Sequence, residues 1–276
     1  MIEDDQDEMD FQLWNELEGA PLDQLHQELK SNDRDRRYAA ARLLHSRGDS
    51  STFNFALEMA KSTSPACREI AAFLMGQLPE LDFSSRNTFI EVLATMLTGD
   101  SDNLVKSSSA SALGHLRAVE KLKELINAAN DNDTRVRENV AFAAGKIDTP
   151  EAIKLLIGLS YDQDIAVVEW ATLGLTNSSH TATSIVADRL TELASHSNRE
   201  IRETAIAALA NTGNKNIMPS LLRALEEDEV NFSIIDAAGQ LGDRRALPLL
   251  LDLARNCRGD IPNVLLNSIS KLGGAD

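Results

Sequence analysis

One helical pattern recurs along the whole chain, and this repetition restricts the fold more than any other feature. Its clearest copy spans residues 131–145. Two aspartates, at 131 and 133, precede it, and such side chains cap the free N–H groups at a helix start. The apolar residues that follow form one narrow stripe of small side chains: Val136, Val140, Ala143 and Ala144. Gly145 ends the pattern, as expected of a glycine that terminates a helix in a left-handed conformation. We therefore predict a short helix that another helix can approach closely.

Copies of this pattern end at regularly spaced markers. The markers are His45, Gly76, Gly114, Gly145, Gly174, Ala210, Gly239 and Gly273. Seven steps cover 228 residues (273 − 45), so the mean period is roughly 33 residues, which is typical of solenoid repeats. Between the markers lies a second Leu- and Ile-rich segment, for example residues 152–159 or 217–225. Each repeat is therefore predicted to be a helical hairpin.

Residues 133–145 resemble a HEAT repeat, in the subtype that also occurs in phycobilin-lyase-like proteins. The residues that carry the resemblance are Asp133, Val136, Arg137, Ala141, Ala144 and Gly145. The resemblance covers residues 22–273 in about eight repeats. It implies an all-α fold, a right-handed α-solenoid of HEAT-like helical hairpins, but it says little about function because repeat folds serve many functions.

A narrower resemblance carries a functional expectation. Residues 22–77, especially 41–48 and 70–77, together with 234–243, are similar to enterobacterial HEAT-repeat proteins encoded beside Rhs-type polymorphic toxins. Proteins of that group are assigned an immunity role from gene neighbourhood. The resemblance implies that this chain binds and neutralises a toxin domain.

The composition fits one elongated body. Hydrophobic residues make up 43% of the 276 residues and aromatic residues only 4%, so small side chains fill the interior. Stacked hairpins need no single large core. We expect residues 1–10 to form a disordered acidic tail and residues 11–276 to form a single solenoid. Within it, residues 11–20 are predicted to cover the exposed end of the first repeat.

The charge balance restricts the class of partner. Lys and Arg number 27 against 43 Asp and Glu, which gives a formal net charge of −16. Such a surface repels nucleic acid and anionic membranes and attracts basic proteins. No apolar run is long enough to span a bilayer, and the acidic N-terminus is unlike a secretory signal. We expect a cytoplasmic protein with a basic protein partner, no nucleic acid and no membrane.

The sequence contains no recognisable catalytic or metal-binding motif. Its five histidines are scattered, and Cys67 and Cys257 are too far apart in sequence for a zinc-site motif. Carboxylate pairs recur at the same turn of successive repeats, as helix caps do. Cations recur in one slot, which indicates structural bonds to carboxylates: Arg37, Arg68, Lys106, Arg137 and Arg202. We predict no catalytic residue, no metal, no cofactor and no enzymatic activity.

One face of the second helices is the candidate binding surface. Residues seven and three positions before each marker share a face that points away from the Val/Ala stripe. We call it the second-helix face, and HEAT architecture implies that it lines the concave groove. Four of the twelve aromatic residues fall there beside carboxylates, which suits docking of a basic protein. The candidate partner-binding residues are Tyr38, Glu69, Phe73, Glu138, Phe142, Glu203, Phe232 and Asp236, with Trp170 one position off this register.

The sequence leaves alternative binding surfaces and functions open. The rings of Phe73 and Phe142 could instead pack against the next repeat, and the convex face could be the one that binds. A bilin-lyase-like enzyme shares the repeat subtype, but the sequence shows no His/Cys/Asp cluster suited to a chromophore. A HEAT-like DNA-lesion-binding protein would need a basic, Trp-rich groove, which the charge argues against. The leading interpretation is a non-enzymatic immunity protein that binds a basic bacterial toxin domain.

Overall fold

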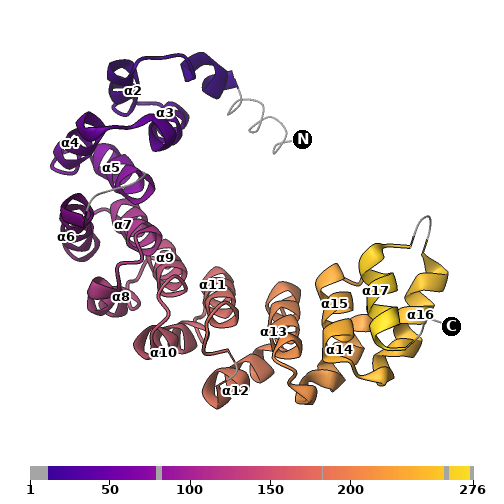
Figure 1. The fold of residues 1–276 in the computed structure, drawn as a ribbon. Coiled ribbons are helices and arrows are strands. Elements are labelled where there is room, and N and C mark those ends of the chain that lie inside the picture. The colour runs from indigo at the N-terminus through magenta and orange to yellow at the C-terminus, as the bar shows by residue number, and fades with distance from the viewer. Residues whose placement is uncertain (1–11, 79–82, 182, 258–260, 274–276) are drawn as a thin grey trace. The chain divides into compact units, whose positions relative to one another are not determined.

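The chain folds into helical hairpins (Figure 1). The structure, a computed structural model, describes residues 12–78, 83–181, 183–257 and 261–273, and within these ranges it contains helices and no strand. Sixteen α-helices, α2 to α17, pair as eight hairpins. They divide into two compact units, unit 1 (Met1–Ile147) and unit 2 (Asp148–Asp276), with four hairpins each. The tail predicted at residues 1–10 lies outside the described residues.

Each hairpin has a first and a second helix. In unit 1 the first helices are α2 (Leu22–Glu28), α4 (Ser50–Met59), α6 (Phe83–Gly99) and α8 (Leu122–Ala128), and the second helices are α3 (Arg34–Arg47), α5 (Pro65–Gln77), α7 (Asn103–His115) and α9 (Thr134–Ala144). In unit 2 the first helices are α10 (Pro150–Leu159), α12 (Ser184–Leu193), α14 (Met218–Leu225) and α16 (Leu247–Asn256), and the second helices are α11 (Ile165–Thr176), α13 (Arg199–Asn211), α15 (Phe232–Leu241) and α17 (Asn263–Lys271). Short 3-10 turns precede α8, α14 and α16: η1 (Val119–Lys121), η2 (Lys215–Ile217) and η3 (Arg244–Ala246).

Aspartate side chains cap four of the eight second helices, as predicted, and an asparagine caps a fifth. Asp133 caps α9 by accepting a hydrogen bond from the Arg135 backbone N–H at 2.9 Å. The Arg135 guanidinium also binds this carboxylate and holds the pKa of Asp133 at about 2. Four further caps of this kind occupy the same turn: Asp33, Asp102, Asp164 and Asn198. The recurring aspartates are therefore structural.

The marker glycines act only in part as predicted. Gly145 ends α9 as predicted, but with a right-handed φ of −66° instead of a left-handed one. Gly174 and Gly239 lie inside α11 and α15, so the prediction that they end helices is wrong. Only at the last marker, Gly273, does the expected left-handed conformation occur, with a φ of +78°.

The glycines instead allow second helices to pack closely. A Cβ built on Gly76 would lie 2.7 Å from the Cα of Ala112, and one on Gly114 would lie 2.7 Å from the Cα of Ala143. Both distances are far below van der Waals contact, so no side chain fits there. In unit 1, α5, α7 and α9 thus form a continuous small-residue seam, as the alanine-rich stripe predicted.

Repeated cations bridge successive hairpins. Arg68 donates to the carbonyl oxygens of Ser62 and Thr63 at 2.9 and 3.1 Å and binds both carboxylate oxygens of Asp100 at 2.6 and 2.8 Å. Lys106 makes the equivalent bond to Asp131 at 3.0 Å. In unit 2, Arg202 binds the Glu227 carboxylate at 2.8 Å. The predicted ladder of structural cation–carboxylate bonds is confirmed for these residues.

The segment before α2 packs on the first hairpin. Residues 12–17 are helical, and the side chain of Leu17 is fully buried. Arg36 of α3 pairs with Glu16 at 2.9 Å, and Arg47 donates to the carbonyl oxygens of Glu18 and Ala20. These contacts hold residues 12–20 against the first hairpin, and Phe11 lies outside the described residues.

Candidate functional site

Three predicted residues come together in unit 1. The Tyr38 hydroxyl of α3 donates to the Glu69 carboxylate of α5 at 2.9 Å, and the Tyr38 ring meets Phe73 edge-on at 4.9 Å between centroids. Glu69 is only 4% exposed, and Arg34 approaches it at 3.6 Å. Burial, followed by the Glu69 charge, raises the pKa of Tyr38. The Glu69 carboxylate therefore ties α3 to α5, and little of it faces solvent.

Phe142 forms a second aromatic contact in unit 1. Its half-buried ring lies 5.1 Å from the His115 ring of α7, and the Lys146 ammonium lies 5.1 Å from its centroid. Burial, then the charge of Lys146, lowers the pKa of His115. Glu138, one helical turn earlier on α9, is also half-buried. The rings of Phe73 and Phe142 thus pack against the preceding hairpin.

The predicted residues of unit 2 have different environments. Glu203 is 5% exposed, and its two oxygens accept bonds from Arg199 at 2.7 Å and from Asn231 at 3.1 Å. Phe232, in contrast, is 59% exposed. Asp236 is half-exposed and lies 3.7 Å from the Lys271 ammonium. Trp170 is half-buried and lines a hollow of about 260 Å³ between α11 and α13.

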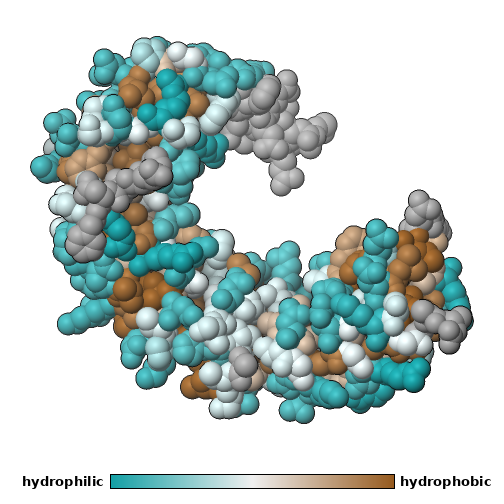
Figure 2. Space-filling model, viewed as in Figure 1, coloured by the Kyte–Doolittle hydropathy of each residue, from teal (hydrophilic) through white to brown (hydrophobic). Residues whose placement is uncertain are grey.

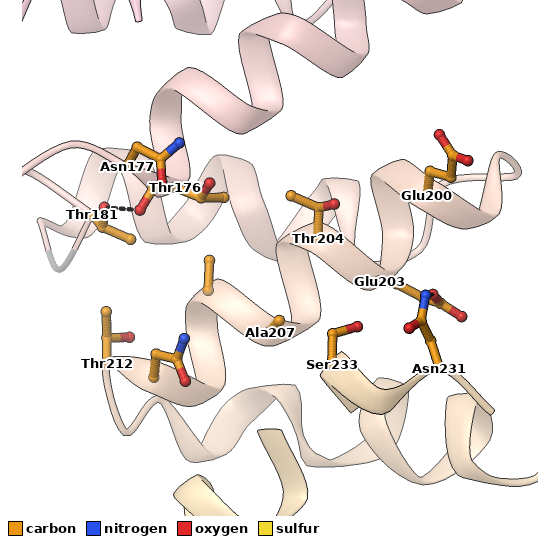
Figure 3. A pocket seen from close by; sticks show the side chains of 12 residues that line it. Thr176, Asn177, Thr181, Glu200, Glu203, Thr204, Ala207, Thr212, Asn231 and Ser233 are labelled. Atoms are coloured by element: carbon orange, nitrogen blue, oxygen red, sulfur yellow. Dashed lines mark hydrogen bonds between the residues drawn. The ribbon is translucent and has the colours of Figure 1, made fainter. Parts of the chain in front are cut away.

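A larger polar groove crosses α13 (Figure 3). Its volume is about 590 Å³, and it runs from the end of α11 across α13 to the start of α15. Ala207 lies at the centre, where its small side chain leaves the groove open, and Thr204, Glu200 and Glu203 follow along α13 (Figure 3). The lining residues are Thr176, Asn177, Thr181, Glu200, Glu203, Thr204, Ala207, Ala208, Asn211, Thr212, Asn231 and Ser233.

Sequence reasoning missed most of this groove. Of the candidates it named, only Glu203 lines it. The missed residues include Glu200 and Asn211, which lie one further helical turn beyond each end of the stripe formed by Glu203 and Ala207. Extending the second-helix face by three or four residues in both directions would have found them.

The groove is lined mainly by polar side chains. Ten of its twelve lining side chains carry oxygen or nitrogen atoms that form hydrogen bonds. Glu200 is exposed and forms no hydrogen bond or ion pair in the described part of the chain, unlike Glu203. Among the described residues no group of three or more His, Cys, Asp or Glu side chains could hold a metal ion.

A family model for HEAT repeats matches residues 22–114, 90–176 and 187–263. The chain is a HEAT-repeat protein. Its similarity to protein YibA of Escherichia coli K12 is 28% identity over 247 residues, covering 87% of this chain and 88% of YibA. The crystal structure of E. coli YibA superposes with a TM-score of 0.80 at 26% identity, covering 96% of this chain and 97% of that one. These matches confirm the predicted all-α solenoid class.

Another similarity concerns the fold alone. The CpcE–CpcF complex of phycocyanin lyase from Nostoc matches this HEAT-repeat protein with a TM-score of 0.51 at 16% identity, covering 80% of this chain and 93% of that chain. Within the described ranges, no helix combines the length and the hydropathy needed to cross a membrane. On the visible face of each unit most residues are hydrophilic, and smaller hydrophobic patches are interspersed among them (Figure 2).

Proposed function

We propose that this HEAT-repeat protein is a non-enzymatic scaffold that binds a basic protein partner through its second-helix face. The observation that carries the proposal is the polar groove of unit 2, which presents the exposed carboxylate of Glu200 and four polar side chains that have no hydrogen-bond partner among the described residues: Asn177, Thr204, Asn211 and Ser233. Phe232, at the start of α15, adds an exposed ring of the kind that anchors protein interfaces. The net charge of −16 favours the approach of a positively charged partner.

The partner in this proposal is a basic bacterial toxin domain, and the protein acts as its immunity protein in the cytoplasm. The similarity of residues 22–77 and 234–243 to proteins encoded beside Rhs-type toxins supports this role. Binding over the active site or substrate surface of the toxin would neutralise it without any chemistry by this chain. The likeness to phycocyanin lyase extends to the fold alone, so we do not extend that activity to this protein.

The test is binding and growth rescue with the toxin domain encoded beside the gene of this protein. Phe232→Ser removes an exposed ring from a second helix, and Ile185→Ser is a matched control because Ile185, on first helix α12, is 57% exposed. We expect wild type and the control to bind and to rescue growth. The Phe232→Ser variant should bind at least about tenfold more weakly, as expected for the loss of an aromatic anchor.

Two results would contradict the proposal. Absence of toxin binding by the wild type would remove the immunity role. Equal binding by the Phe232→Ser and Ile185→Ser variants would show that the second-helix face of unit 2 is not the docking surface.

A further inference from the structure

The polar groove has the length of a short extended peptide. From Glu200 to Thr212 the helix α13 and its cap advance about 18 Å, at roughly 1.5 Å per residue. An extended chain rises about 3.4 Å per residue, so about five residues span the groove. The groove is open along this length, with the small side chain of Ala207 at its centre (Figure 3).

The lining groups suit a polypeptide main chain. An extended peptide presents N–H donors and C=O acceptors that need partners when they leave water. Asn177 and Asn211 carry both donor and acceptor atoms, and the hydroxyls of Thr204 and Ser233 can act as either. The side chains of these four residues form no hydrogen bond or ion pair within the described part of the chain, so they are available to a ligand.

One carboxylate in the groove is available to a cation. Both oxygens of Glu203 are occupied by Arg199 and Asn231, whereas Glu200 is exposed and has no partner among the described residues. Arg199, a nearby cation, is itself held by Glu203 at 2.7 Å and by Glu227 at 3.5 Å. Glu200 can therefore pair with a ligand cation at one end of the groove.

We propose that the polar groove binds an extended peptide segment of about five residues that carries a Lys or Arg side chain. The side chains of Asn177, Asn211, Thr204 and Ser233 bond its main chain, and Glu200 pairs with its cation. This inference rests on the proposed function and names the part of the partner that enters unit 2. It concerns an unfolded or loop segment of that partner, because only an extended chain exposes its main chain in this way.

The probe is a phage-displayed library of random seven-residue peptides, selected on the full-length protein, followed by affinity measurement with labelled synthetic copies. Enriched peptides should share one Lys or Arg in an otherwise uncharged sequence. Glu200→Gln should weaken the binding of these peptides about tenfold, as expected when a charge-assisted hydrogen bond is lost. Glu151→Gln is the control, since Glu151 is exposed on first helix α10 and should leave affinity unchanged.

A second variant tests the groove itself. Ala207→Leu fills its centre without changing charge, and peptide binding should be lost while the circular dichroism spectrum stays the same. Peptides that lack a basic residue, or that bind the Glu200→Gln variant as tightly as wild type, would overturn the inference. So would tight binding to a folded Ala207→Leu variant.

The two proposals fail separately. Peptide binding that depends on Glu200, with no binding of the toxin domain, would support this inference and remove the proposed function. Toxin binding that depends on Phe232, with no peptide enrichment, would overturn this inference and leave the proposed function standing.

Discussion

The second-helix faces of the two units are built on the same repeat positions but are filled differently. In unit 1 these positions hold the large rings of Tyr38, Phe73 and Phe142, which pack on neighbouring hairpins, and the hollow beside Phe73 measures only about 110 Å³. In unit 2 the position equivalent to Phe142 holds Ala207, and a groove of about 590 Å³ remains. At this position the size of the side chain thus decides between packing, as at Phe142, and an open groove, as at Ala207.

The two units agree in one respect. Glu69 and Glu203 stand seven residues before their markers, and both are buried and hydrogen-bonded to a different hairpin. These two glutamates are therefore structural in both units. The same slot holds the exposed Phe232 before the marker Gly239, so differences in binding should come from Phe232 and from Glu200, which lies outside the slot.

The largest expected effect concerns the seam of unit 1. Gly114→Ala should lower the free energy of unfolding by about 2 kcal/mol, because its new Cβ would meet the Cα of Ala143 at 2.7 Å. In unit 2 the marker Ala210 already carries a Cβ, whereas a Cβ on the marker Gly239 would lie 2.9 Å from the Cα of Ser268. The control is Gly158→Ala, because no atom lies within 4 Å of the new Cβ. There the higher helix propensity of alanine should raise the free energy of unfolding by about 0.5 kcal/mol. Urea denaturation of both variants measures this, and equal stabilities would mean that the seam is looser than described.

Removing an aromatic ring from unit 1 should lower the free energy of unfolding by somewhat less than Gly114→Ala does. Phe142→Ala leaves a half-buried cavity beside His115, and we expect a loss of about 1.5 kcal/mol in unfolding free energy, below the range for fully buried rings. The reverse change in unit 2, Ala207→Phe, places a ring in an open groove and should change stability by less than about 0.5 kcal/mol. Thermal unfolding compares the two variants. A larger cost for Ala207→Phe would show that the groove is not open.

Substitutions of the two glutamates of α13 should differ in their effect on the free energy of unfolding. Glu203→Gln weakens the bond to Arg199 in a buried site and should cost about 1 kcal/mol. Glu200→Gln, at an exposed position without a partner in the described chain, should change unfolding free energy by less than about 0.5 kcal/mol. Denaturation curves that place both variants at the same stability would contradict the distinction.

The smallest effect is a pH dependence in unit 1. Burial and the charge of Lys146 lower the pKa of His115 in the folded state below the ordinary value of 6.5. The unfolded chain therefore takes up a proton first as the pH falls, so this contribution to stability is present above pH 6.5 and is lost below it. His115→Gln should flatten the stability profile between pH 7.5 and 5.5. An unchanged profile would mean that His115 titrates alike in both states.

The fold could be predicted because its determinants are local. A period of roughly 33 residues, capping aspartates and a stripe of small residues are each visible within a single repeat. The site could not be predicted as fully, because burial on the second-helix face depends on partners from other hairpins. Glu69 meets Tyr38 31 residues away and Glu203 meets Asn231 28 residues away, and no repeat pattern reports such pairs. The glycine markers were misread for the same reason: their role lies in contacts with the next helix.

The most direct test of the central claim, that a protein partner docks on the second helices, is hydrogen–deuterium exchange of the protein with and without its bound toxin domain. The account predicts that binding slows exchange at the end of α11, along α13 and at the start of α15, and leaves the first helices α10, α12 and α14 unchanged. Slower exchange confined to those first helices, with none at α13, would contradict it.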